Sequence, residues 1–265
     1  MDKKVLFLLL FAFLNMAGQA QTEEHGGFWN VDEWTANGVL VMVAPDYPDD
    51  NTRYEPQSPF IFYGPSRLSD GIFGGKYSGF HLRDKPWKNA NFGVTLLQFS
   101  RNIYHRKAGV TAALQFGGES YEISRDYALQ KEGNRLGFVP VEEPLSVSDL
   151  SFSWVRIPLL VGVQTFHRRL TLQTGPALYA AFDCKYYYKM KGREEEKRRL
   201  HINHFGVQWH VTAGIGPIVV TYSQYLTPLF KLADGTRAYP SSITIGFDVW
   251  HLLTQIHDWK NKHKH

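Results

Sequence analysis

The sequence predicts an all-β fold, an eight-stranded antiparallel up-and-down transmembrane β-barrel, with ten strands as the alternative. Three observations indicate this fold in a chain of 265 residues. The chain begins with an export signal, its later segments alternate apolar and polar residues as half-buried strands do, and the links between those segments are alternately short and long. Turns at the periplasmic end of such barrels are short and extracellular loops are long. After the export signal, no run of 18 or more apolar residues predicts a membrane-spanning helix.

Residues 1–20 have the three parts of a secretory signal peptide. Charged residues at 2–4 precede an apolar stretch, Val5–Leu14, and small residues lead to a cleavage site after Ala20. A membrane anchor is the alternative, but an apolar run of about 10 residues is too short for a bilayer that needs roughly 20. The single cysteine, Cys184, does not follow the signal as a lipoprotein's cysteine would, and it permits no intramolecular disulfide.

The region from 21 to 70 has an uncertain structure. Its two apolar stretches, GVLVMV (38–43) and SPFIFYG (58–64), are consistent with an extra hairpin that would make ten strands. They are also consistent with a segment on the periplasmic side or in the lumen, which leaves eight strands and is favoured. We therefore place the start of the barrel at residue 71 and its end at residue 250.

Eight segments are expected to form the barrel wall. In 151–166, for example, Val155, Ile157 and Leu159 share one face, and Arg156 and Gln164 share the other. The glycine-rich first segment is the weakest, although its glycines suit a bend in a closed sheet. The segments are 72–82, 91–101, 107–121, 151–166, 168–182, 205–216, 217–226 and 241–250.

The lengths of these segments favour a membrane barrel over its alternative, a soluble periplasmic β-sandwich. They run to about 10–16 residues, whereas strands of soluble proteins usually have about 5–6. The polar face should point into the lumen and the apolar face toward lipid. Aromatic residues near strand ends are expected to form interfacial girdles, namely Trp154, Tyr179, Tyr222 and Trp250. The basic tail 251–265 follows the barrel as a short amphipathic helix or a frayed end.

The polar faces predict a polar network in the lumen. An eight-stranded barrel has an interior that side chains fill, and buried charges need partners. We expect an internal salt-bridge network, with a small ligand pocket or a pore as the functional alternative. Its expected members are Glu119, Arg156, Arg169, Gln208, His210 and Asp248, together with Gln115, Gln164, Gln173 and Tyr225.

Histidines and a serine raise two chemical hypotheses. His204 and His210 share a face of one strand but lie about 20 Å apart at roughly 3.3 Å per residue, and His201 lies near them without an acidic or cysteine ligand. No metal site and no cofactor are therefore expected. Ser223, His210 and Asp248 all face inward, but a catalytic triad is recognised by geometry and not by composition.

The segment 185–200 predicts an exposed extracellular loop with a mixed charge run. Its basic residues Arg193, Lys197, Arg198 and Arg199 are candidates for contacts with lipopolysaccharide phosphates or a protein partner. Mixed charges more often mark a solvated hairpin tip. The formal net charge of the whole chain, +4, is too weak a bias on an exported protein to predict nucleic-acid binding.

The segment 155–182 resembles the small outer-membrane β-barrels of Bacteroidota, the group that includes PorT-like proteins. The resemblance rests on Ile157–Leu160 in one strand and Gly175–Tyr179 in the next, with the GIGP turn (214–217) and the SITIGF strand (242–247) in support. It covers roughly residues 90–250 and carries no catalytic residue. The sequence departs from the family because about 15 residues follow Trp250, and because 21–70 matches no part of it.

The expected protein is a non-catalytic barrel in the outer membrane of a Gram-negative bacterium. The resemblance implies a structural, interaction, secretion or envelope-assembly role, with outer-membrane lipids and proteins of the secretion or envelope machinery as partners. Two alternatives stay open. One is a barrel enzyme that modifies lipid A or phospholipid, and the other is a small ligand-binding or pore-forming barrel.

Overall fold

The structure is a computed structural model. It describes residues 34–37, 54, 56–74, 78–83, 85, 87–104, 107–132, 135–165, 170–190, 196–200 and 202–248. The expected signal peptide, the tail 251–265 and Trp250 lie outside these residues. Within them, no helix is long or apolar enough to cross a membrane.

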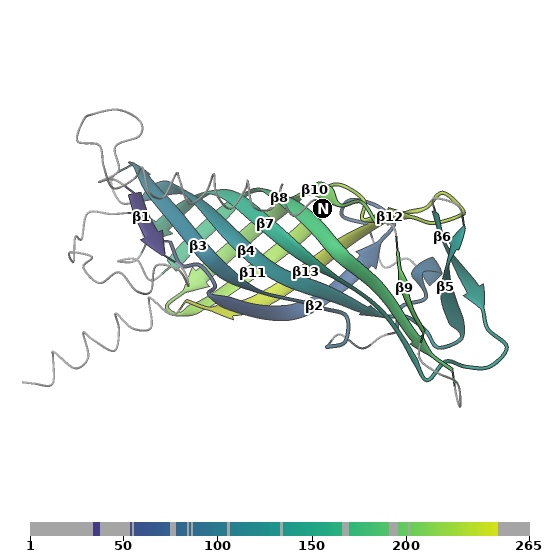
Figure 1. The fold of residues 1–265 in the computed structure, drawn as a ribbon. Helices are drawn as coiled ribbons and strands as arrows, with labels where there is room; N and C mark the ends of the chain where they lie inside the picture. The colour runs from purple at the N-terminus through teal and green to yellow at the C-terminus, as the bar shows by residue number, and fades with distance from the viewer. Residues whose placement is uncertain are drawn as a thin grey trace, which may run out of the picture.

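Eight antiparallel strands form a closed barrel, as predicted. Each wall strand pairs with the next along the chain, and the ring closes because the last strand pairs with the first through Ile245↔Tyr63 and Phe247↔Ile61. Figure 1 shows the strands crossing the barrel at a common tilt. The wall strands are β2 (Ile61–Ser69), β3 (Ala90–Tyr104), β4 (Ala108–Glu122), β7 (Val147–Thr165), β8 (Leu170–Lys189), β10 (Phe205–Ile215), β11 (Ile218–Tyr225) and β13 (Arg237–Phe247).

The first strand is not the one expected. The segment 72–82 contains the short 3-10 helix η3 (Ser78–Phe80) and a turn in which Phe73 has a φ of 60°. β2 forms instead from residues 61–69, within the region left uncertain, so the barrel begins before residue 71. The proline in β2 obscures the strand pattern, because Pro65 has no N–H to donate. The β13–β2 pairing is interrupted there, between Tyr63↔Ile245 and Ser66↔Ser242.

The outer face of the wall is an apolar belt. Side chains on the strands alternate between buried and exposed, and the exposed ones at mid-height are aliphatic or aromatic. A polar lumen and an apolar exterior are the arrangement that lipid requires of a spanning barrel. Members of the belt include Ile61, Phe92, Phe116, Leu159, Val161, Val163, Leu172, Leu178, Phe205, Val211, Ile215, Ile218, Val220, Ile243, Ile245 and Phe247.

Short and long connections alternate around the barrel, as predicted. β3–β4, β7–β8 and β10–β11 are joined by short turns, the last at Gly216, whose φ of 57° suits glycine. The four long connections gather at the opposite end and carry the smaller elements (Figure 1). These are η3, the β5–β6 hairpin (Tyr127–Glu132 and Arg135–Pro140), β9 (Glu196–Arg199) and β12 (Phe230–Lys231).

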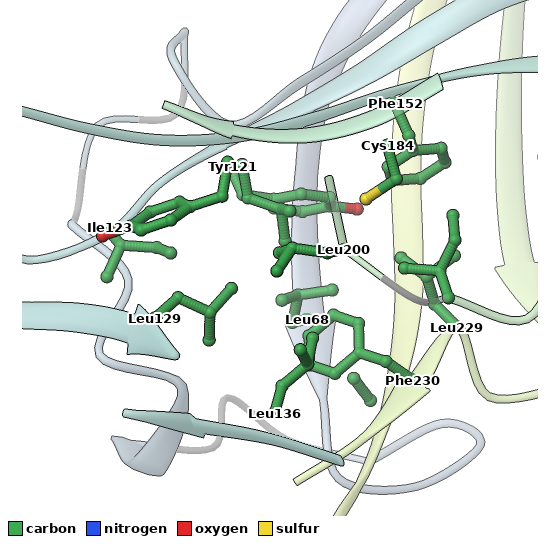
Figure 2. Packing of buried hydrophobic residues seen from close by; sticks show 14 of the residues in the cluster. Leu68, Tyr121, Ile123, Leu129, Leu136, Phe152, Cys184, Leu200, Leu229 and Phe230 are labelled. Atoms are coloured by element: carbon green, nitrogen blue, oxygen red, sulfur yellow. The ribbon is translucent and has the colours of Figure 1, made fainter. Parts of the chain in front are cut away.

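The long loops share one hydrophobic core with the upper part of the barrel. Leu129 of β5 and Leu136 of β6 are 0% and 2% exposed, and they pack with wall residues such as Tyr121 and Phe152 (Figure 2). Backbone contacts join the loops directly, since Leu136 bridges to Leu232. The loop end is therefore a folded cap over the barrel mouth.

Candidate functional site: the lumen and its closures

The lumen is lined by polar side chains from all parts of the wall. Of the expected network, Glu119, Arg156, Gln208, His210 and Asp248 are at most 7% exposed. Gln115, Gln164, Gln173 and Tyr225 are also buried, each at most 6% exposed. Arg169 lies outside the described residues.

Arg156 holds the centre of one cluster. Its guanidinium stacks on Trp154, with 3.8 Å between Cζ and the ring centre. Its Nη1 donates to Gln208 Oε1 at 3.0 Å and lies 3.4 Å from His210 Nε2. His210 Nε2 is also 2.9 Å from Gln208 Oε1. A flat cation over an indole face and beside neutral acceptors is a stable way to bury an arginine.

Glu119 sits in a separate cluster of tyrosines. Tyr121 donates to Oε2 at 2.7 Å and Tyr225 donates to Oε1 at 3.0 Å. Tyr121 also bonds with Ser66, at 2.8 Å between the hydroxyl oxygens, so the cluster reaches from β4 to β2 and β11. Glu119 and Arg156 do not form a direct ion pair. The lumen therefore stabilises these two charges by hydrogen bonds and ring stacking, without a direct salt bridge between them.

The segment 54–60, just before β2, enters the lumen from the turn end and closes it. Gln57 accepts from Thr171 at 2.9 Å through Oε1 and from Gln173 at 3.0 Å through its carbonyl. Pro59 accepts from Thr95 Oγ1 at 2.7 Å. Tyr54 and Gln57 are 1% and 0% exposed. One of the placements considered for 21–70, inside the lumen, is thus the one that these residues adopt.

Inward-facing glycines make the room for this segment. A Cβ on Gly109 of β4 would lie 2.2 Å from the Tyr54 ring, and one on Gly162 of β7 would lie 2.4 Å from the Tyr54 hydroxyl. A Cβ on Gly214 of β10 would lie 2.5 Å from Gln57. Sequence reasoning offered the lumen as one placement for 21–70 but did not identify which residues enter it. The glycines at inward positions of three strands were its signal, because the lack of a Cβ at each leaves the room that Tyr54 and Gln57 occupy.

The serine, histidine and aspartate of the triad hypothesis do not come together. His210 and Ser223 are opposite each other in the β10–β11 register. Asp248 is six residues beyond Ser242, the partner of Ser223 on β13, which is roughly 20 Å along the strand. At that end, Asp248 Oδ2 accepts from the Ser58 N–H at 3.1 Å. The geometry therefore offers no Ser-His-Asp relay.

Of the other histidines of the metal hypothesis, only His204 lies within the described residues. His204 Nδ1 lies 2.9 Å from the Ala181 carbonyl, and His201 is outside the described residues. In the described part of the chain, no three histidine, cysteine or acidic side chains gather as metal ligands would.

The expected contact loop is only partly described. β9 extends the sheet beyond β8, with Lys197, Arg198 and Arg199 opposite Tyr187, Tyr186 and Lys185 in the register. Arg193 lies outside the described residues.

Two of the expected girdle aromatics face the lumen instead. Trp154 and Tyr179 are 0% and 3% exposed. Both belong to the inward set of alternating positions, and the glycines Gly93 and Gly117 leave space for the indole. Strand phase therefore decides which way an aromatic side chain points, and nearness to a strand end does not.

The chain has structural similarity to solved outer-membrane barrel structures. The chain is similar to Ail, the attachment invasion locus protein of Yersinia pestis, solved in complex with the heparin analogue sucrose octasulfate. The sequence identity is 13%, the match covers 71% of this chain and 94% of that chain, and the TM-score is 0.33. No protein-family model and no curated protein matches the chain. The barrel fold is established by the chain's own strand pairing and closure.

Proposed function

We propose that this protein is an outer-membrane barrel of a Gram-negative bacterium that acts through its folded outer end. The belt supports a membrane location, and the barrel architecture supports the outer membrane, where such barrels occur. The observation that carries the role is the cap, in which residues from the four long loops share one buried core. A surface held in one shape by such a core is suited to binding a partner without first paying for loop ordering.

The role is structural or interactive and not catalytic. The lumen is closed at one end by the cap and at the other by residues 54–60, which supports neither a pore nor an open active site. The separation of Asp248 from His210 removes the basis for the lipid-modifying alternative. Lipopolysaccharide and a protein of the secretion or envelope machinery are the proposed partners, the second through the resemblance of 155–182 to PorT-like barrels.

The test is photo-crosslinking in living cells. A photoreactive residue at Gln130, exposed on β5, should crosslink to one defined protein, while the same residue at Lys107, exposed at the turn end, should not give that product. Equal products from both positions would contradict a binding role for the cap, and lipid alone from Gln130 would contradict a protein partner for it. Purified protein in planar bilayers should give no steady conductance, and a stable channel would favour the pore alternative.

A further inference from the structure

The upper edge of the belt carries an exposed aromatic pair beside two adjacent basic residues. Tyr63 of β2 and Trp87 are stacked with ring centres 6.2 Å apart, and the Tyr63 hydroxyl donates to the Trp87 carbonyl at 2.6 Å. The two rings are 42% and 71% exposed. Tyr63 is opposite the belt residue Phe92. Tyrosine and tryptophan at such a level are the aromatics that sit between lipid and water.

Arg67 and Lys88 continue the same two chain segments upward. Each is two positions beyond the Pro65↔Ala90 pair, and the Ser66 N–H to Asn89 carbonyl bond of 2.7 Å keeps the segments together above that pair. Two like charges on neighbouring segments repel each other. An anion between or above them would remove that repulsion.

Two carboxylates of the described chain partly supply that anion to Lys88. Lys88 Nζ lies 3.6 Å from Glu122 Oε2, whose Oε1 binds Arg83 Nη1 at 2.5 Å, and Asp149 also lies within electrostatic range of Lys88. Arg67 donates from Nε to Ser241 Oγ at 3.0 Å, so its terminal nitrogens remain for an acceptor outside the described chain. Lys85, also exposed, lies in the same turn, since its carbonyl accepts from the Lys88 N–H at 3.0 Å.

From this arrangement, we infer that Arg67 and Lys88, together with Tyr63 and Trp87, bind a phosphate-bearing glycolipid of the outer leaflet, namely lipid A. The two cations take a phosphate, and the aromatic pair lies against the sugar and the first acyl carbons. The long loops mark this end of the barrel as the outer one, where the membrane lipid is lipopolysaccharide and not phospholipid. This inference rests on the proposed outer-membrane location.

Native mass spectrometry of the full protein, titrated with purified diphosphoryl lipid A, tests the site. The double variant Arg67→Gln/Lys88→Gln should bind about tenfold more weakly, because it loses two ionic contacts and the hydrogen bonds to a charged phosphate. The charge-matched control Lys107→Gln/Lys231→Gln should bind like the unmodified protein. Dephosphorylated lipid A should bind the unmodified protein as weakly as diphosphoryl lipid A binds the double variant.

The heat-dependent gel shift of folded barrels measures the folded fraction of each variant, and binding is compared for folded protein only. A folded double variant with unchanged affinity would overturn the inference, as would equal binding of phosphorylated and dephosphorylated lipid. Trp87→Ala should weaken binding of both lipids, because the ring contact does not involve phosphate. Crosslinking from Gln130 should persist in the double variant, so failure of this site and failure of the cap proposal are distinguishable.

Discussion

The guanidinium of Arg156 lies 3.8 Å from the centre of the Trp154 ring, which stands two positions earlier on β7 and on the same inward face. The same indole also stacks on Phe62 of β2, with 6.1 Å between ring centres. A buried charge is thus placed between aromatic rings on one side and the amide of Gln208 on the other. This contact makes Arg156 a structural element of the lumen.

Removal of the Arg156 charge should destabilise the barrel. Arg156→Met removes the opposite charge that acts on Glu119 across the lumen, and because the two form no direct ion pair, the loss in free energy of unfolding should be below the about 3–5 kcal/mol of a broken buried pair. Urea unfolding from lipid vesicles measures that loss. The double variant Arg156→Met/Glu119→Gln should recover most of it. A double variant no more stable than the single one would show that the two charges are not coupled.

Gly109→Ala should expel the segment 54–60 from the lumen. Its new methyl group would overlap the Tyr54 ring and approach the Arg101 carbonyl at 2.5 Å, and overpacking of this kind costs about 1–3 kcal/mol. Limited proteolysis should then cut the chain before β2 faster than in the unmodified protein. Tyr54→Ala in the same chain should relieve the ring overlap and restore part of the stability. Gly235→Ala serves as a control, because its new methyl group would contact nothing within 4 Å. The φ of 91° at this position means that the control also measures the effect of backbone strain.

Asp149 should make the outer end more stable at acid pH. It lies on β7 above the belt, directly opposite Glu122, and its pKa is raised by burial first and by the Glu122 charge second. Because the folded state then holds this proton more tightly than the unfolded state, stability is greatest below the ordinary aspartate pKa and falls as pH rises through the raised value.

The variant Asp149→Asn should abolish that fall. Its unfolding midpoint in urea should exceed that of the unmodified protein at pH 7, by a small margin because Asp149 is partly exposed, and should match it at pH 3.5. A midpoint that is lower at pH 7 would mean that the carboxylate is stabilising. Ser151→Ala, on the same outer face, should leave the pH profile unchanged.

Cys184 should resist thiol reagents in the folded protein. Burial first, and the neighbouring Asp183 carboxylate second, raise its pKa to about 12. The thiolate is the reactive form, so the side chain should remain unlabelled by a maleimide at pH 8 and become labelled fully in denaturant. Rapid labelling of native protein would show that the cap core around Cys184 opens.

Much of the barrel could be predicted from the sequence, because each wall strand has one face toward lipid and the other toward the polar lumen. The alternation at Val155–Gln164 and the short turn at Gly216–Pro217 predicted strand positions, facing and the sorting of loops by end. Those features are local in sequence. The closing strand pair was harder, because Pro65 and Gly64 disturb the pattern of β2 while its partner β13 lies far along the chain.

The contacts between side chains inside the lumen could be predicted less well from the sequence than the wall strands. The alternation of residues along each strand identified Glu119, Arg156 and His210 as inward residues. It carries no information on height along the barrel axis, and that height decides which side chains contact each other. Height separated Asp248 from His210 and gave Glu119 two tyrosines as partners. The segment 54–60 has no strand periodicity, and only the glycines that receive it marked its place.

The segment 54–60, which fills the turn end of the lumen, also binds to the last strand, β13, near the pairing that closes the ring. The Phe60 N–H donates to the Phe247 carbonyl at 2.8 Å, and the Ser58 N–H donates to Asp248 Oδ2, so residues just before the first strand clasp the end of the last one. Those two strands are the most distant in the chain, and pairing of such distant segments is the slow step of folding. The hydrogen bonds of Ser58 and Phe60 therefore add stability to the ring at the pairing whose closure costs the most chain entropy.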